Sequence, residues 1–176
     1  MDKYFKQLTT QIDMLDPNQF NKSPMRDFLG QAFYYNINNQ TYTDYLMSKF
    51  KDLNPHDVFW CEFPGARPHI DHDGFQCGIN HYYNTEQAAT VYYTPKENML
   101  PYVGDGESTA NFYKREDISE VARFVAEPNS VWLLKVDEIH SVDLPQWDSG
   151  IRTFVKWRFY EPYEVIYKKL FGTDPE

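Results

Sequence analysis

The first third of the chain carries apolar residues at helical spacing. A stripe with intervals of one, three, four and three positions is formed by Tyr4, Phe5, Leu8, Ile12 and Leu15. Such intervals are typical of an amphipathic helix, and Asp16-Pro17-Asn18 provides a stop signal. Further helices are predicted over residues 24–34 and 43–53. The pattern therefore predicts a helical support over residues 1–55.

The pattern changes after residue 55 to short runs rich in aromatic and β-branched residues, which are typical of strands. Strands are predicted over residues 58–63, 76–83, 90–94, 131–136 and 152–160. The stretch 97–127 is less regular, contains a helix-like piece at 117–124, and is interpreted as an insertion over one mouth of the β-structure. Helices followed by many short strands favour a mainly β (α+β) barrel or sandwich with an N-terminal helical support. We expect a single domain over 1–176, with a β core over 56–162 and a C-terminal tail over 163–176.

Composition limits the classes of function. The chain has 176 residues, of which 41% are hydrophobic and 18% aromatic, enough for one domain with a developed core. Its net charge of −9 makes nucleic acid an unexpected partner. Cys61 and Cys77 are expected to be reduced thiols. The N-terminus lacks a signal peptide's apolar core and no apolar run reaches the ~18 residues of a membrane span, so a cytoplasmic setting without membrane attachment is expected. The oligomeric state is left open.

Three residues could hold a metal ion. His69 and Asp71 form a His-x-Asp at a strand end, and residues i and i+2 of an extended chain point to the same face. His140 follows a buried strand much later in the chain. Two neutral imidazoles and one carboxylate suit iron(II) and leave one face of an octahedron open. A bidentate keto acid and O2 would occupy that open face.

Arg152 opens the last predicted strand. A guanidinium can hold a carboxylate through two parallel hydrogen bonds, so Arg152 is the expected anchor for the far carboxylate of a dicarboxylic keto acid. Lys156 and Arg158 share its strand parity and could replace it if the register differs. Arg67 shares the parity of His69 and could reach the mouth of the site.

The order His69-x-Asp71, His140, Arg152 resembles the motif of the 2-oxoglutarate- and iron(II)-dependent oxygenases, in particular the prolyl-hydroxylase-like branch. The run from Cys77 to Asn84 is similar to that family's aromatic-rich strand, and the likeness covers roughly residues 58–160. The interval from His140 to Arg152 is longer than in close relatives, so residues 147–150 are expected to loop out. The resemblance implies a double-stranded β-helix (jelly-roll, cupin-like) fold, with Fe(II) and 2-oxoglutarate as cofactors.

The same resemblance implies that Tyr82 hydrogen-bonds the far carboxylate of the keto acid, and Asn80 on the same strand face is expected to assist. It implies a dioxygenase that hydroxylates a C–H bond of a peptidyl or small-molecule substrate and releases succinate and CO2, and the carboxylate of Asp71 favours hydroxylation. Two alternatives remain open. One is a non-catalytic cupin-like or β-helix binding module, and the other is a cupin dioxygenase that does not use 2-oxoglutarate.

Overall fold

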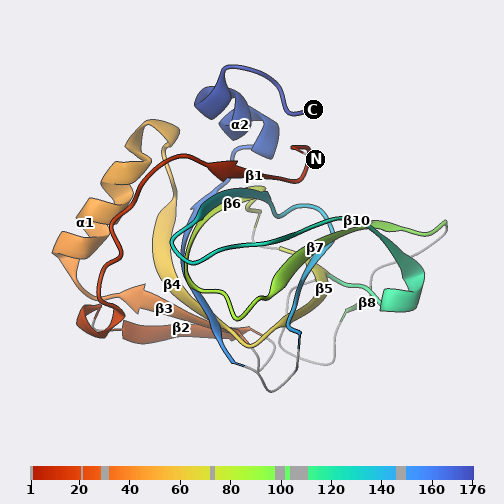
Figure 1. Ribbon diagram of the computed structural model, residues 1–176, viewed down its shortest axis with the longest axis horizontal. Helices are drawn as coiled ribbons and strands as arrows, with labels where there is room; N and C mark the ends of the chain where they lie inside the picture. Colours follow the sequence, from red (N-terminus) through yellow and green to blue (C-terminus); the bar gives the residue numbers. More distant parts are fainter. Residues whose placement is uncertain are drawn as a thin grey trace.

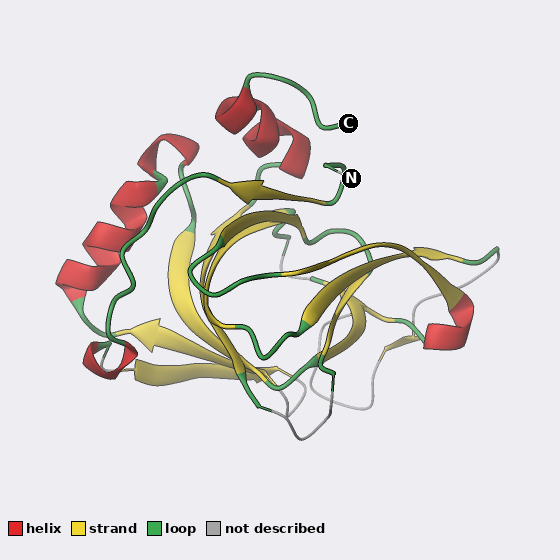
Figure 2. Ribbon diagram, in the orientation of Figure 1, coloured by secondary structure: helices red, strands yellow, loops and turns green. Residues whose placement is uncertain are grey.

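The computed structural model describes residues 2–20, 22–28, 32–71, 74–97, 102–103, 111–145 and 150–176. Strands dominate these ranges, and the two helices lie on the outside of the β-structure (Figure 1, Figure 2). In chain order the elements are β1 (Phe5–Leu8), β2 (Lys22–Phe28), β3 (Ala32–Ile37), α1 (Gln40–Lys49), β4 (Asp57–Phe63), β5 (Ala66–Ile70), β6 (Cys77–Asn84), β7 (Ala89–Pro95), β8 (Tyr102–Val103), β9 (Asn111–Phe112), β10 (Ile118–Val125), β11 (Val131–Lys135), β12 (His140–Asp143), β13 (Arg152–Phe159) and α2 (Tyr163–Phe171), with 3-10 turns at Pro17–Gln19, Lys51–Leu53 and Arg115–Asp117.

The strands form two antiparallel sheets. The major sheet has the order β1-β11-β6-β13-β4-β3-β2, and the minor sheet has the order β10-β7-β12-β5-β9-β8. From β4 to β7 and again from β10 to β13, successive strands belong to alternate sheets. The chain thus winds as a pair of strands around one interior, which is a double-stranded β-helix. The predicted fold class is confirmed.

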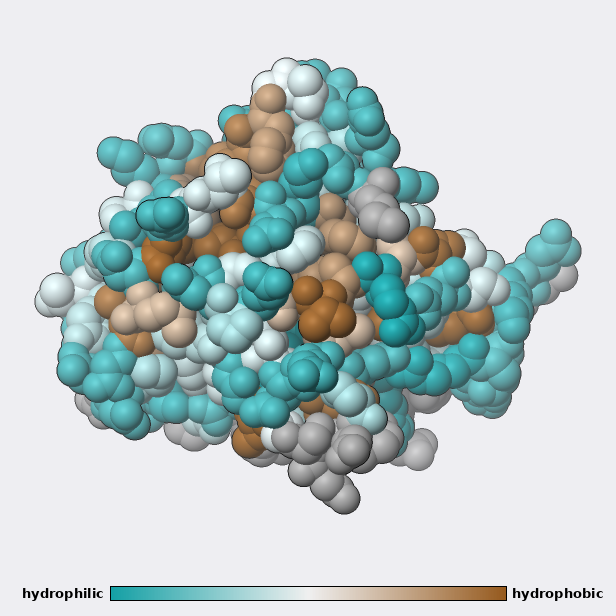
Figure 3. Space-filling view, viewed as in Figure 1, coloured by the Kyte–Doolittle hydropathy of each residue, from teal (hydrophilic) through white to brown (hydrophobic). Residues whose placement is uncertain are grey.

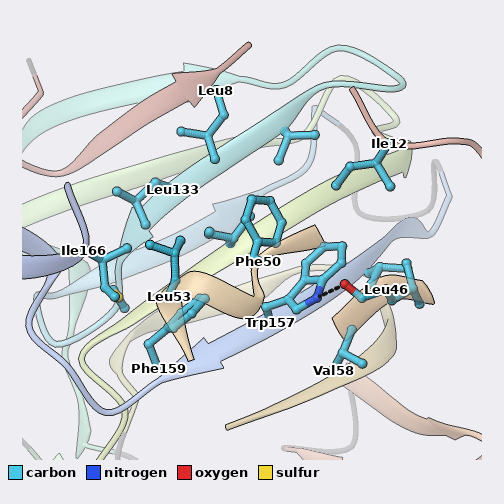
Figure 4. Close-up of a cluster of buried hydrophobic side chains, with 14 of the residues drawn as sticks. Leu8, Ile12, Leu46, Phe50, Leu53, Val58, Leu133, Trp157, Phe159 and Ile166 are labelled. Carbon is cyan, nitrogen blue, oxygen red and sulfur yellow. Dashed lines mark hydrogen bonds between the residues drawn. The ribbon is translucent and has the colours of Figure 1, made fainter. Parts of the chain in front are cut away.

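Two apolar clusters stabilise the major sheet, one on each face. The outer cluster lies between the sheet and the helices, and includes Leu46, Trp157, Phe159 and Ile166 (Figure 4). Trp157 is fully buried there and donates a hydrogen bond from Nε1 to the carbonyl of Leu46 at 3.1 Å. The inner cluster lies between the two sheets and includes Phe59, Tyr82, Tyr92, Val142 and Phe154. The central strands β6, β13 and β4 therefore bury residues on both of their faces.

Two of the three helices predicted in the first third are wrong. Residues 5–8 form β1, which pairs with β11 and sends Phe5 into the inner cluster and Leu8 into the outer one. The spacing resembles that of a helix because Phe5 and Leu8 lie on opposite faces of an edge strand. Ile12 and Leu15 then follow in the next loop at similar intervals. The segment predicted as a helix over 24–34 contributes β2 and β3, which pair with each other. Pro24 lies on an edge strand, where the missing N–H is tolerated.

The third predicted helix is confirmed as α1, with Asn39 as its N-cap. The helix-like piece at 117–124 is wrong, because these residues form β10 at the edge of the minor sheet. A shift of register between Glu120 and Ala122 gives its apolar residues a spacing close to that of a helix. The five predicted strands are confirmed as β4, β6, β7, β11 and β13.

The C-terminal stretch begins with α2, which packs Tyr163, Ile166 and Tyr167 into the outer cluster. Val165 and Phe171 on the same helix are 41% and 37% exposed, and apolar surface gathers below α2 in the upper part of Figure 3. Within the described ranges, no helix combines the length and the apolar composition needed to cross a membrane.

Candidate metal centre

Two paired strands of the minor sheet bring the first motif and the distal histidine together. His69 lies near the end of β5, and His140 opens β12 directly opposite it in the antiparallel register. Asp71 follows β5, and its backbone N–H donates to the carbonyl of Val136 at 3.1 Å. The ligand atoms that His69, Asp71 and His140 can offer lie within 4.8 Å of one another. The three predicted ligands therefore meet at one point.

Backbone carbonyls orient both imidazoles. Nδ1 of His69 donates to the carbonyl of Arg67 at 2.7 Å, and Nδ1 of His140 donates to the carbonyl of Glu138 at 2.9 Å. Carbonyl oxygens can only accept, so each ring carries its proton on Nδ1 when neutral and presents Nε2 as an electron-pair donor. The two Nε2 atoms lie 3.3 and 3.8 Å from Oδ1 of Asp71. Facial ligands at about 2.1 Å from a metal lie about 3 Å apart, so this donor set fits a divalent ion.

The second oxygen of Asp71 faces a cation. Nζ of Lys156, on β13 of the opposite sheet, donates to Oδ2 of Asp71 at 3.0 Å. Burial raises the pKa of Asp71, but Lys156 and the two histidines outweigh that effect and hold the pKa well below its usual range. Burial, assisted by His69, lowers the pKa of His140 to about 4. Asp71 is therefore anionic and His140 neutral near pH 7, which are the forms that bind metal.

Arg152 lies deep between the two sheets. Its side chain is 2% exposed, and its guanidinium donates to Oγ1 of Thr90 at 2.9 Å and to the hydroxyl of Tyr82 at 2.8 Å. Both partners are neutral, and within the described ranges no carboxylate pairs with it. Phe154 and the ring of Tyr82 flank the guanidinium, with centroids at 5.3 and 4.6 Å. A buried cation without an anion is unfavourable, so this group is suited to receive an anionic ligand.

Three buried polar atoms of the same interior lack partners among the residues described. They are Oδ1 of Asn80, the hydroxyl of Tyr92 and Nε of Arg152. Buried polar groups are normally hydrogen-bonded. Asn80 also donates through Nδ2 to the hydroxyl of Tyr82 at 3.1 Å, so Asn80, Tyr82 and Arg152 form one connected group. The open donors, Nε of Arg152 and the hydroxyl of Tyr92, beside a buried cation fit a polar, anionic ligand such as a dicarboxylic keto acid.

The other sequence candidates have separate positions. Arg158 pairs with Asp57 and stacks over Phe75, and Lys156 hydrogen-bonds Asp71, so each of these cations is paired with a carboxylate. Arg67 is exposed, because β5 carries an extra residue between the positions paired with His140 and Val142. The parity with His69 that was expected for Arg67 is broken at this bulge.

Some predictions fall on residues outside the described ranges. Most of the expected loop at 147–150 lies there, as does much of the interpreted insertion. Its described parts are β8, β9, the turn at Arg115–Asp117 and β10.

Thr90 and Tyr92 were not found by sequence reasoning. Both lie on β7 with inward-facing side chains, Thr90 bonded to Arg152 and Tyr92 packed 5.9 Å from His140 between ring centroids. The alternation in Thr90-Val91-Tyr92 was the available signal, since residues two apart share a face. It could not indicate which face was the interior.

Comparison with known proteins gives a likeness of fold. No family model matches the chain, and no curated protein matches it. Among solved structures, E. coli ycfD matches with a TM-score of 0.53 at 12% identity, over 99% of this chain and 57% of that one. The chain thus spans little more than half the length of ycfD, and the likeness shows the fold alone.

Two further matches are to structures of SnoN. One is the epimerase in complex with Fe3+, alpha ketoglutarate and nogalamycin RO, with a TM-score of 0.46 at 12% identity, over 89% of this chain and 78% of that one. The other is the non-heme alpha ketoglutarate dependent epimerase from nogalamycin biosynthesis, with a TM-score of 0.44 at 12% identity, over 92% and 84%. At such TM-scores these matches carry no weight for function.

Proposed function

We propose that this chain is an iron(II)- and 2-oxoglutarate-dependent oxygenase that hydroxylates a C–H bond. The observation that carries the proposal is a buried guanidinium, Arg152, that no carboxylate of the described residues meets, in the same interior as a cluster of two histidines and one carboxylate. The cluster fits a divalent metal and Arg152 fits the far carboxylate of a keto acid. The order of these residues in the sequence resembles the motif of this oxygenase family.

Each side chain has a defined part in this proposal. His69 and His140 hold the metal through Nε2, with their orientation fixed by backbone carbonyls. Asp71 offers Oδ1. Arg152 binds the far carboxylate of 2-oxoglutarate, and Tyr82 and Asn80 supply further hydrogen bonds from the same strand face. The surrounding aromatic rings exclude water, which strengthens these electrostatic interactions.

Iron and 2-oxoglutarate supply the oxidising chemistry when bound. In the proposed reaction, one oxygen atom of O2 enters the substrate as a hydroxyl group and the other enters succinate, while the keto acid loses CO2. The substrate we propose is a peptidyl residue or a small molecule rather than a nucleic acid. Both cysteines are free and buried, which agrees with the reducing, cytoplasmic setting that we also propose.

Turnover of 2-oxoglutarate tests the proposal. Purified chain would be supplied with Fe(II), a reductant, 2-oxoglutarate and O2, and succinate would be measured over panels of peptides and small molecules. We expect succinate from the parent chain and from Lys135→Met, whose lysine is paired with Glu164 on the outside of the major sheet, and none from His140→Ala.

Two outcomes would replace the proposal. Metal binding without any consumption of 2-oxoglutarate, but with O2-dependent oxidation of a substrate, would favour a cupin dioxygenase. Metal or ligand binding with no turnover of either would favour a non-catalytic binding module.

A further inference from the structure

Lys156 is a buried lysine whose ammonium contacts a predicted metal ligand. Its side chain is 8% exposed, and Nζ lies 3.0 Å from Oδ2 of Asp71. The fold makes room for it, because a Cβ on Gly78 of the neighbouring strand would come within 3.1 Å of Cε of Lys156. Within the described ranges, Asp71 is the one hydrogen-bonding partner of this ammonium. A buried lysine so placed is rare unless it is paired.

The charges of the interior change when a metal enters. In the metal-free chain, Asp71 neutralises Lys156. A dication on Oδ1 of Asp71 would put two further positive charges a few ångströms from the ammonium, in an interior where Arg152 is a second cation with only neutral partners among the described residues. Repulsion between like charges is strong where water is excluded, so Lys156 opposes binding of the metal alone.

An anion at the open positions reverses this effect. A keto acid that chelated the metal would add negative charge beside Lys156, and Arg152, on the same face of β13, would hold its far carboxylate. The two lysine N–H groups that Asp71 does not use can donate to such an anion. Lys156 and Arg152 thus act on opposite ends of the same dianion.

We infer that Lys156 couples metal binding to keto acid binding, so that the centre holds its metal weakly until a carboxylate ligand arrives. This inference rests on the proposed function. This role differs from the one that strand parity allowed, in which Lys156 could replace Arg152 as the anchor of the far carboxylate. Lys156 instead acts as a positioning residue that sets the charge beside the metal site. A lysine that merely ties the two sheets together would affect folding stability and leave this coupling unchanged.

Mn(II) binding measured by calorimetry, with and without saturating 2-oxoglutarate at one fixed pH, tests the inference. The coupling factor is the ratio of the two Mn(II) dissociation constants. In Lys156→Met we expect Mn(II) alone to bind about tenfold or more tighter than in the parent, and the coupling factor to fall by about tenfold or more.

Three further variants separate charge from packing. Lys156→Gln keeps a donor for Asp71 without the charge, so we expect it to behave as Lys156→Met does, and it serves if the methionine variant does not fold. Lys156→Arg keeps the charge and should retain coupling within about threefold of the parent. Lys135→Met is the matched control, because that lysine is 12% exposed and its side chain pairs with the carboxylates of Glu164 and, at 3.7 Å, Glu138 rather than with a ligand, and it should match the parent.

The outcomes distinguish this inference from the proposed function. If the parent shows coupling and both Lys156→Met and Lys156→Gln keep the parental Mn(II) affinity and coupling factor, the role of Lys156 is wrong and the oxygenase proposal stands. Weaker Mn(II) binding in both variants would also overturn it. If the parent binds no Mn(II), or binds it without any response to 2-oxoglutarate, both the proposed function and the inference are wrong.

Discussion

The two faces of β13 differ in almost every physical respect. Its outward face carries Val155, Trp157 and Phe159, all buried in the outer apolar cluster, in which Figure 4 labels Trp157 and Phe159. Its inward face carries Arg152 and Lys156, both buried and both charged. Successive strand residues point to opposite sides, so eight residues of one strand serve a hydrophobic core and a charged interior at once.

The difference separates stability from function. Burying the outward residues favours folding by the hydrophobic effect. Burying two cations on the inward face opposes folding unless anions meet them, and within the described ranges the one carboxylate that does so is Asp71. Buried charged side chains in place of a hydrophobic core occur mostly at functional sites. We therefore interpret the charged positions of the inward face as a binding site for anions and metal, whereas the outward face of β13 contributes only to stability, together with apolar inward residues such as Phe154.

Loss of a histidine ligand should give the largest effect. His69→Ala and His140→Ala each leave two ligands, and we expect metal affinity to fall by more than about 100-fold, the upper range for losing only a hydrogen-bond partner of a ligand. Titration with Mn(II) measures this. His81→Asn is the control, because His81 is buried and bonded to Asn129 on the opposite face of β6. Parental affinity in both ligand variants would refute the triad.

A substitution on the outward face should lower the free energy of unfolding. Trp157→Ala removes a fully buried indole and its hydrogen bond to Leu46, and we expect the free energy of unfolding to fall by about 3–5 kcal/mol. Urea unfolding measures it, and metal affinity of the folded variant should stay parental. A loss of metal affinity with unchanged stability would mean that the two faces are not separate in function.

A substitution on the inward face should lower the affinity for the ligand. Arg152→Ala would remove the two charge-assisted hydrogen bonds that we propose for the keto acid, so 2-oxoglutarate affinity should fall by about 10- to 1000-fold. Arg152→Lys should recover part of that loss, since an ammonium cannot form the planar fork. Calorimetry on the Mn(II)-loaded protein gives both values, and metal affinity without keto acid should not fall. Equal 2-oxoglutarate affinity in all three proteins would move the anchor elsewhere.

Acid should weaken the metal-free protein through His140. Its pKa is about 4 in the folded chain against about 6.5 when unfolded, so the unfolded state binds more protons between these values. Stability should therefore decline as pH falls from about 6.5 to 4, by about 3 kcal/mol at most. The lowered pKa of Asp71 acts below this window. Urea unfolding with chelator at several pH values measures the slope, which His140→Gln should reduce. A slope unchanged in that variant would mean that another group causes the acid sensitivity.

Five strands of the β-helix, β4, β6, β7, β11 and β13, could be predicted because each is a compact run of aromatic and β-branched residues, as in Val58 to Phe63. The metal cluster could be predicted because strand parity brings His69 and Asp71 together. The errors arose where a spacing of three residues fits both one face of a helix and the two faces of a strand. Phe5 and Leu8 are an example: they lie on opposite faces of an edge strand, and only the pairing with β11 decides this. Strand parity predicts that Lys156 lies on the same face as Arg152. Its contact with Asp71 could not be predicted, because it connects two sheets and depends on how they pack.

The central claim is that metal and keto acid bind together in the charged interior. Anaerobic addition of 2-oxoglutarate to the Fe(II)-loaded chain, followed by visible absorbance, tests it most directly, because a keto acid chelating iron gives a charge-transfer band. We predict a saturable band at one keto acid per chain, absent in His140→Ala and requiring about 10- to 1000-fold more keto acid in Arg152→Ala. Iron that binds through His69 and His140 but gives no such band would contradict the account.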